Sequence, residues 1–163
     1  MKSKKILLLS ATAMLALTGC NGNKKVEFSE YKSAVAELVK SEDYGKEPKT
    51  MKIKGSIKSE DETLEVKGLK ISEDMTKEDT DKLSVGEAKF LVAYAVVASM
   101  LKPQTFATVE SEDMTYYIGN GFKVKADSEE IKGVVSWDKY GALTKAKVES
   151  EDLTCNFTVS YKY

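Results

Sequence analysis

The chain has 163 residues, of which 25 are basic and 26 acidic, so its formal net charge is −1. Every basic residue is Lys, and the chain contains neither Arg nor His. It therefore lacks the side chain that most often serves as a general base or a metal ligand, and it lacks the guanidinium group that binds phosphate in a bidentate manner. This composition argues against an enzyme, against a metal or other cofactor, and against nucleic acid as a partner.

The N-terminal residues follow the pattern of an export signal. Lysines near the start of the chain are followed by the apolar run 6–17, which is interrupted only by Ser10 and Thr12. This run is too short for a transmembrane helix, which needs about 20 apolar residues. A basic start before a short apolar run is the layout of a secretory signal, so we expect residues 1–19 to be a signal peptide.

The apolar run closes on Leu17-Thr18-Gly19-Cys20. This sequence resembles the lipobox of bacterial lipoproteins. The resemblance implies cleavage before Cys20 and acylation of its thiol by fatty acids such as palmitate. It also implies a lipoprotein anchored at the extracytoplasmic face of the cell membrane. Two acyl chains hold a protein stably on a bilayer, at roughly 0.8 kcal/mol per buried CH₂. The alternative is an ordinary cleaved signal in which the cysteine stands by chance.

The remainder of the chain is long enough for one domain with a real core. We expect residues 20–27 to be the lipidated N-terminus and a short polar tether, and residues 28–163 to be a single extracytoplasmic domain. The tether spans only about 20 Å when extended at ~3.3–3.6 Å per residue, which keeps the domain close to the membrane. Within 28–41, apolar residues recur on one helical face, which predicts an amphipathic helix lying against the core.

A second helix is predicted over 84–102. Ser84-Val85-Gly86-Glu87 has the spacing of a capping box, and Pro103 ends the helical pattern. The segment 90–101 is apolar on every side, but it rises only about 18 Å, against a membrane core of ~30 Å. We therefore expect a central helix that is buried all round, in which an aspartate at Ala95 would prevent folding.

Elsewhere apolar and polar residues alternate with period two, which indicates antiparallel strands with one solvated face. The predicted strands are 51–58, 63–71, 104–110, 114–125, 131–137, 142–149 and 154–162. Asn120-Gly121 is either a bulge inside its strand or a further hairpin turn. The predicted fold is α+β: a curved antiparallel sheet of about seven strands packed on the buried central helix, with the amphipathic helix alongside.

A Ser-Glu-Asp-x-Thr sequence recurs where the predicted strands turn, at 59–63, 72–76, 111–115 and 150–154. The copy at 72–76 is expected to lead into a helix. Calcium would need six to eight oxygens converging on one point. Successive turns of a five-strand meander alternate between its ends, so the turns near 111 and 150 should lie apart unless Asn120-Gly121 is itself a turn. Soluble turn chemistry explains the acidic residues better than a metal site does.

Two further features bear on function. Cys155 shares a strand face with apolar residues, which predicts a buried, inert thiol. Aromatic side chains could line an apolar ligand pocket, and the candidate ligand-binding residues are Tyr94, Tyr116 and Trp137. The alternative is that these three residues simply fill the core.

The combination of lipobox, short tether and curved sheet with a helix on its concave face is similar to the plan of the lipoprotein-carrier and mycobacterial lipid-binding lipoprotein group. That likeness implies an acyl ligand held between sheet and helices. The chain departs from the group in having fewer strands and a bulky segment, 90–101, where a lipid would lie.

We therefore expect a non-enzymatic, membrane-anchored lipoprotein that binds an apolar ligand or an envelope component. The alternative is a protein-interaction module at the cell surface without an internal cavity. A cavity beside Tyr94 and Trp137 would favour the first function, and a large exposed apolar patch would favour the second.

Overall fold

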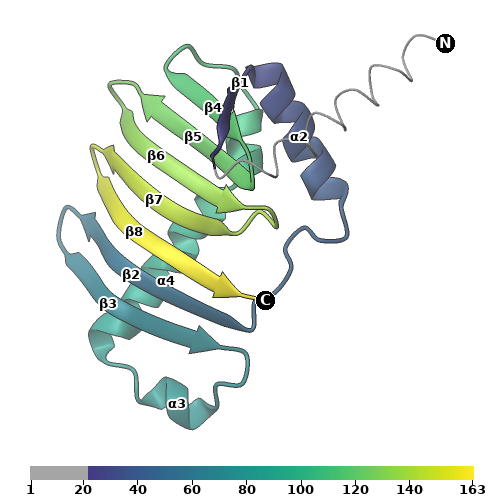
Figure 1. Ribbon diagram of the computed structural model, residues 1–163. Coiled ribbons are helices and arrows are strands. Elements are labelled where there is room, and N and C mark those ends of the chain that lie inside the picture. Colours follow the sequence, from purple (N-terminus) through teal and green to yellow (C-terminus); the bar gives the residue numbers. More distant parts are fainter. Residues whose placement is uncertain (1–21) are drawn as a thin grey trace.

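The computed structural model describes residues 22–163, so the predicted signal peptide and Cys20 lie outside the described residues. The described chain forms one open antiparallel sheet of eight strands, with α2, α4 and η1 on one face and the other face bare (Figure 1). The α+β class is confirmed, with eight strands where about seven were expected.

The strands are β1 (Lys24–Val26), β2 (Thr50–Ser59), β3 (Thr63–Ser72), β4 (Met114–Ile118), β5 (Gly121–Asp127), β6 (Ile131–Asp138), β7 (Leu143–Ser150) and β8 (Leu153–Lys162). The helices are α2 (Phe28–Lys40), α3 (Lys77–Asp81), α4 (Val85–Met100) and the 3₁₀ helix η1 (Pro103–Ala107).

The strand order is β1-β4-β5-β6-β7-β8-β2-β3, so the meander β4–β8 forms the middle of the sheet. The hairpin of β2 and β3 extends it beyond β8. At the other edge β1 pairs with β4, placing Val26 opposite Tyr116. The ordered sheet thus begins at Lys24, inside the segment expected to be a tether, because the apolar side chain of Val26 is buried in the core.

Two predicted strands differ from those observed. The run 114–125 is a hairpin of β4 and β5, closed by a hydrogen bond in which the Gly119 N–H donates to the Gly121 carbonyl at 3.0 Å. The run 104–110 is not a strand, because Pro103 stands at the first position of η1 and Phe106 is buried against Trp137, with ring centroids 5.4 Å apart.

The predicted helix starts and stops are confirmed. The Ser84 hydroxyl accepts from the Glu87 N–H at 3.1 Å, and the Glu87 carboxylate accepts from the Ser84 N–H at 2.8 Å, which completes the capping box of α4. The copy of the acidic repeat at 72–76 leads into α3, where Thr76 and Asp79 form a second capping box. α4 ends at Met100, shortly before Pro103.

The prediction that α4 is buried all round is wrong. Phe90, Tyr94 and Val97 face the sheet and are buried, whereas the opposite face of the helix is open to solvent. The exposed apolar side chains of that face include Val85, Val92, Val96 and Met100. Ala95 is also exposed, so an aspartate there would not be buried. The sheet covers one side of α4, and nothing in residues 22–163 covers the other.

Val85–Ala107 is the one helical stretch in the described residues whose length and composition would allow it to cross a membrane. The helix is interrupted, because Leu101 and Lys102 leave helical geometry between α4 and η1. The 16 residues of α4 alone rise about 24 Å, less than the ~30 Å of a hydrocarbon core. Three of its aromatic and aliphatic side chains also pack on the sheet, so α4 is a covering helix in this fold.

The acidic turns at 59–63, 111–115 and 150–154 lie at the same ends of the strands, at the left in Figure 1, whereas the copy at 72–76 follows β3 at the opposite ends. The Asp127 N–H donates to the Asp113 carbonyl at 2.9 Å, Lys132 is opposite Glu149, and Leu153 is opposite Ser59. The Gly119–Gly121 turn causes this alignment, so the turns near 111 and 150 do not lie at opposite ends. Even so, no group of three His, Cys, Asp or Glu side chains within the described residues is placed to hold a metal ion.

Candidate functional site

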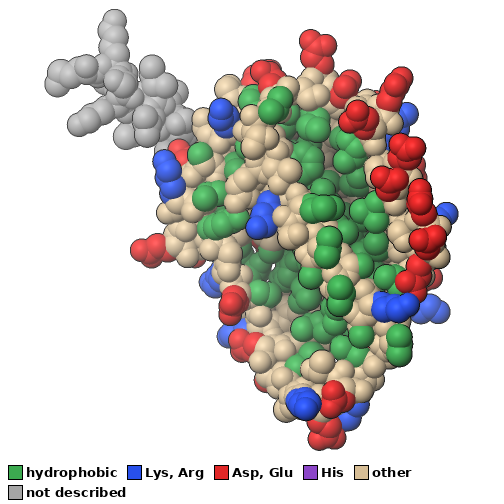
Figure 2. Space-filling model, turned by 180° about the vertical axis from the view of Figure 1, so that it is seen from behind, with side chains coloured by type: hydrophobic (Ala, Val, Ile, Leu, Met, Phe, Trp, Pro, Cys, Tyr) green, Lys and Arg blue, Asp and Glu red, His purple; other side chains and the backbone are tan. Residues whose placement is uncertain are grey.

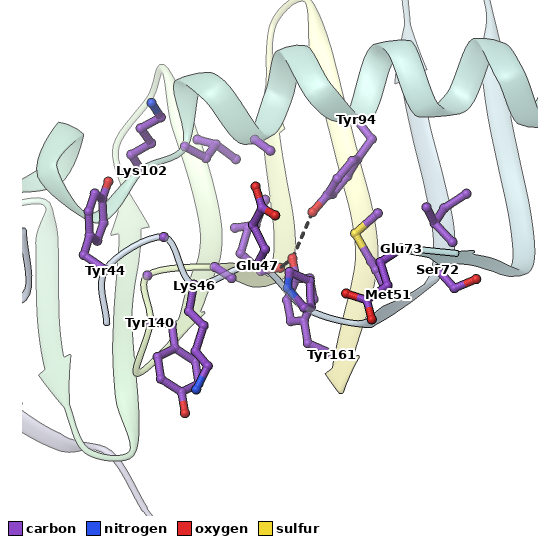
Figure 3. Close-up of a pocket in the computed structure, with 18 residues that line it drawn as sticks. Tyr44, Lys46, Glu47, Met51, Ser72, Glu73, Tyr94, Lys102, Tyr140 and Tyr161 are labelled. Carbon is purple, nitrogen blue, oxygen red and sulfur yellow. Dashed lines mark hydrogen bonds between the residues drawn. The ribbon is translucent and has the colours of Figure 1, made fainter. Parts of the chain in front are cut away.

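A groove of about 580 Å³ lies between the C-terminal half of α4, the loop 41–49 and the ends of four strands, β2, β3, β7 and β8 (Figure 3). Its wall is mostly apolar. The apolar side chains that line it are Pro48, Met51, Ile71, Ala98, Leu101, Ala142 and Leu143, together with the rings of Tyr44, Tyr94, Tyr140 and Tyr161. Its volume is within the range of about 300–1,000 Å³ typical of small-molecule sites.

Two tyrosines meet inside the groove. Tyr94 reaches down from α4 and Tyr161 comes from β8, and their hydroxyls are 3.0 Å apart (Figure 3). The Tyr161 hydroxyl donates to the Leu143 carbonyl at 2.8 Å, so the hydroxyl of Tyr94 is the donor between the two rings. Burial raises the pKa of both phenols, and the neighbouring Tyr94 raises that of Tyr161 further. Both therefore stay neutral at physiological pH and bridge helix and sheet.

The outer wall is held in place by backbone contacts. The Gly45 N–H donates to the Tyr140 carbonyl at 3.0 Å, which ties the loop 41–49 to the β6–β7 turn. In that turn Gly141 has φ +81°, and a Cβ at this position would lie 2.9 Å from the Tyr44 ring. Glycine is required here both by the backbone conformation and by the closeness of the ring. Gln104 donates to the Tyr44 hydroxyl and fixes the same ring from the α4 side.

The polar groups of the groove lie at its rim. Lys46 and Glu47 come from the loop, Glu73 follows β3, and Lys102 follows α4; all four are exposed. The Lys46 ammonium lies 5.1 Å from the centre of the Tyr140 ring. An apolar interior with a charged rim suits a ligand that has an apolar body and a polar end.

The three aromatic residues singled out from the sequence do not come together. Tyr94 lines the groove. Tyr116 is buried beside Phe28 and Tyr31, with ring centroids 5.3 and 5.0 Å away, and it does not line the groove. Trp137 is also buried, and its indole N–H donates to the Leu101 carbonyl at 2.7 Å. Trp137 therefore holds the C-terminal end of α4 against the sheet.

Cys155 lies on the apolar face of β8 and is 3% exposed. Burial raises the pKa of its thiol to about 11, which keeps it protonated and unreactive at neutral pH. The prediction that this thiol is buried is confirmed, and its lack of reactivity stays a prediction.

Sequence reasoning missed most of the groove wall. Tyr161 continues the apolar alternation of β8, so its inward direction could have been read from the sequence. Tyr44 and Tyr140 stand in loops, where no periodicity assigns a direction to a side chain. Gly141 beside Tyr140 is a turn residue, but its close approach to Tyr44 depends on the tertiary fold.

Comparisons with protein-family models, with curated proteins and with solved structures give no match for this chain. The function is therefore argued from the site itself.

Proposed function

We propose that this protein is a membrane-anchored, non-enzymatic bacterial lipoprotein that holds an apolar ligand in the groove between α4 and the sheet. The observation that carries the proposal is the groove itself, which is lined by apolar side chains and tyrosine rings and bordered by charged side chains. The lipobox-like Leu17–Cys20 sequence supports the anchor and the extracytoplasmic location.

The expected ligand is an amphiphile with an acyl or similarly elongated apolar part. Met51, Leu101 and Leu143 offer contact surface without hydrogen-bonding groups, which suits hydrocarbon. The charges of Lys46 and Lys102 at the rim are available to an anionic end group, whereas the Tyr94–Tyr161 pair has already satisfied its own hydrogen bonds. The groove is open to solvent along one side, so a ligand could enter without unfolding of α4.

Two substitutions on the same helix test the proposal. Ala98 lines the groove, whereas Ala95 lies on the exposed face of α4. Ala98→Trp should fill the groove and weaken binding of a fluorescent fatty-acid probe by tenfold or more, which corresponds to about 1.4 kcal/mol. Ala95→Trp adds the same ring outside the groove and should leave the affinity unchanged. Equal affinity of both variants for the probe would contradict binding in this groove.

A second candidate function, protein interaction, is favoured by the exposed face of α4. Val85, Val92, Val96 and Met100 form an apolar band along that face, and the acidic turns form a row beside it, at the right in Figure 2. An apolar band next to a negative row is complementary to a basic amphipathic helix. Binding of a model Leu/Lys helical peptide, lost in Val92→Asp and absent for a Leu/Glu peptide, would support this candidate; equal binding of the two peptides would exclude it.

Interaction through a strand edge is less well supported. The edge strand β3 contains an irregularity opposite Ile53–Gly55, and exposed Lys67 and Lys70 lie along it. Bulges and edge lysines are features that oppose pairing with another strand. At the other edge, β1 has only three residues.

A further inference from the structure

The bare face of the sheet carries lysine at most of its charged positions. Along each strand the buried side chains alternate with exposed ones, and the exposed set points away from α2 and α4. The lysines of this set are Lys25, Lys52, Lys54, Lys58, Lys70, Lys123, Lys125, Lys132, Lys145, Lys147 and Lys162. We call this surface the lysine face; it is the side turned toward the reader in Figure 1.

The strand register turns these lysines into a regular lattice. One row across five strands reads Lys123, Ser136, Lys145, Thr158, Lys54. Lysines on alternate strands are therefore about 10 Å apart, and lysines two residues apart on one strand are about 7 Å apart. In this row the intervening Ser136 and Thr158 are shorter than lysine and uncharged, so the ammonium groups can extend beyond them.

These positive charges are not neutralised within the fold. In the described residues, the lysines that form ion pairs are Lys82 and Lys89, and neither belongs to the lysine face. The acidic residues at the exposed strand positions are Glu65, Asp127 and Glu149. Many of the other carboxylates lie in the turns between strands, outside the lysine face. Lysines this close repel one another, because their spacing is comparable with the Debye length of ~8 Å at physiological salt.

We propose that the lysine face docks on the anionic headgroups of the bilayer to which the chain is anchored. A positive surface is complementary to the negative surface of an anionic membrane, and each Lys near that membrane adds to the attraction. The inference rests on the proposed membrane anchoring, and it adds a second contact to the lipid anchor and fixes how the domain lies on the membrane.

The position of the N-terminus allows this orientation. The described chain starts at Gly22 and enters β1, an edge strand of the sheet. Three residues of extended chain reach only about 10 Å, so a lipid attached at Cys20 could not be far from the start of the described chain at Gly22. The apolar band of α4 and the groove opening lie on the helix side, so docking through the lysine face leaves both accessible to the aqueous phase.

The test is a lysine footprint of the full chain in lipid nanodiscs. Nanodiscs of phosphatidylcholine alone are compared with nanodiscs that also contain phosphatidylglycerol, and the modification of each Lys by a water-soluble amine reagent is followed by mass spectrometry. In the anionic discs we expect Lys54 and Lys145 to react slower by roughly fivefold or more, since they approach the surface. Lys32 and Lys40, which are exposed on α2 and do not line the groove, should react at the same rate in both. Roughly 1 M salt, with a Debye length of ~3 Å, should abolish the difference.

A pair of charge-matched variants completes the test. Lys54→Glu with Lys145→Glu should remove the protection of Lys125 and Lys147, whereas Lys32→Glu with Lys40→Glu on α2 changes the net charge equally and should preserve it. Equal rates for Lys54 and Lys145 in both types of disc would overturn the proposal. Protection of Lys32 and Lys40 in their place, or of all lysines alike, would also overturn it. None of these results depends on the groove, so failure of docking is distinguishable from failure of ligand binding.

Discussion

Two neighbouring residues of α4 provide a sharp test of the way this helix packs on the sheet. Val96 is 54% exposed, whereas Val97 is 3% exposed and faces the sheet. Aspartate at position 97 would lose about 1.5–3 kcal/mol of apolar burial. It would also place an unpaired carboxylate in the core, at an effective cost of several kcal/mol.

We therefore expect Val97→Asp to lower the free energy of unfolding by at least ~4 kcal/mol, out of about 5–15 kcal/mol for a domain of ordinary stability. Val96→Asp should change the free energy of unfolding by no more than roughly 0.5 kcal/mol, beyond the helix-propensity and helix-dipole contributions that both variants share. The helix propensity of aspartate and its position near the negative end of the helix dipole affect the two variants alike, so they cancel in the comparison.

The assay is urea unfolding followed by far-UV circular dichroism, with the unfolding slope compared between the variants. If Val96→Asp were as destabilising as Val97→Asp, the outer face of α4 would be covered in solution and the packing described here would be incomplete. If neither variant were destabilised, α4 would not form part of the core.

Three further predictions concern single side chains. Burial raises the pKa of Tyr31 above its ordinary value of 10.0, so above pH 10 the unfolded chain releases a proton that the folded chain keeps. Through this residue the free energy of unfolding should fall by about 1.4 kcal/mol per pH unit above pH 10. Tyr31→Phe should therefore make the loss of stability at alkaline pH less steep. An unchanged slope would contradict this coupling. The Cys155 thiol, with a pKa raised from 9.0 to about 11, should react with a thiol reagent only as fast as the protein opens, and rapid labelling of the folded protein would show that it is accessible. Cys20→Ser should yield an uncleaved precursor without acyl label in radiolabelled cells, and normal acylation of that variant would refute the lipoprotein prediction.

The strands and caps could be predicted because their determinants are local. Cys155, Phe157 and Val159 alternate with polar residues, and the Ser84–Glu87 capping box depends on residues three apart, so short sequence windows contain the whole signal. The sequence does not decide the structure at Asn120, because Gly119 and Gly121 fit a bulge as well as a hairpin turn. Pairing of Tyr116 with Val124 settles it as a hairpin, and that contact spans the turn.

The burial of α4 could not be predicted, because it depends on how much of the helix the sheet can cover. An apolar segment has the same composition whether one face or all faces are buried, so Val92 and Val97 look equivalent in the sequence. They differ only because the sheet lies on one side. Likewise, 104–110 alternates as a strand would, yet Pro103 and the contact of Phe106 with Trp137 place it in η1.

The candidate site was predictable only in part for the same reason. Tyr94, a candidate ligand-binding residue from the sequence, lines the groove. The groove also depends on loop residues such as Tyr44 and Tyr140, whose positions follow from the Gly45–Tyr140 hydrogen bond and the turn at Gly141. A sequence pattern identifies such residues as aromatic and says nothing of where a loop will carry them.

Native mass spectrometry of the full chain, extracted from the membranes of a bacterial host, tests ligand binding most directly. We expect the unsubstituted protein to carry a bound amphiphile that is lost on denaturation. The same ligand should be retained in Ala95→Trp and missing from Ala98→Trp. The mass of the ligand-free protein in all three forms would contradict it, and weight would shift to the exposed face of α4 as a surface for protein partners.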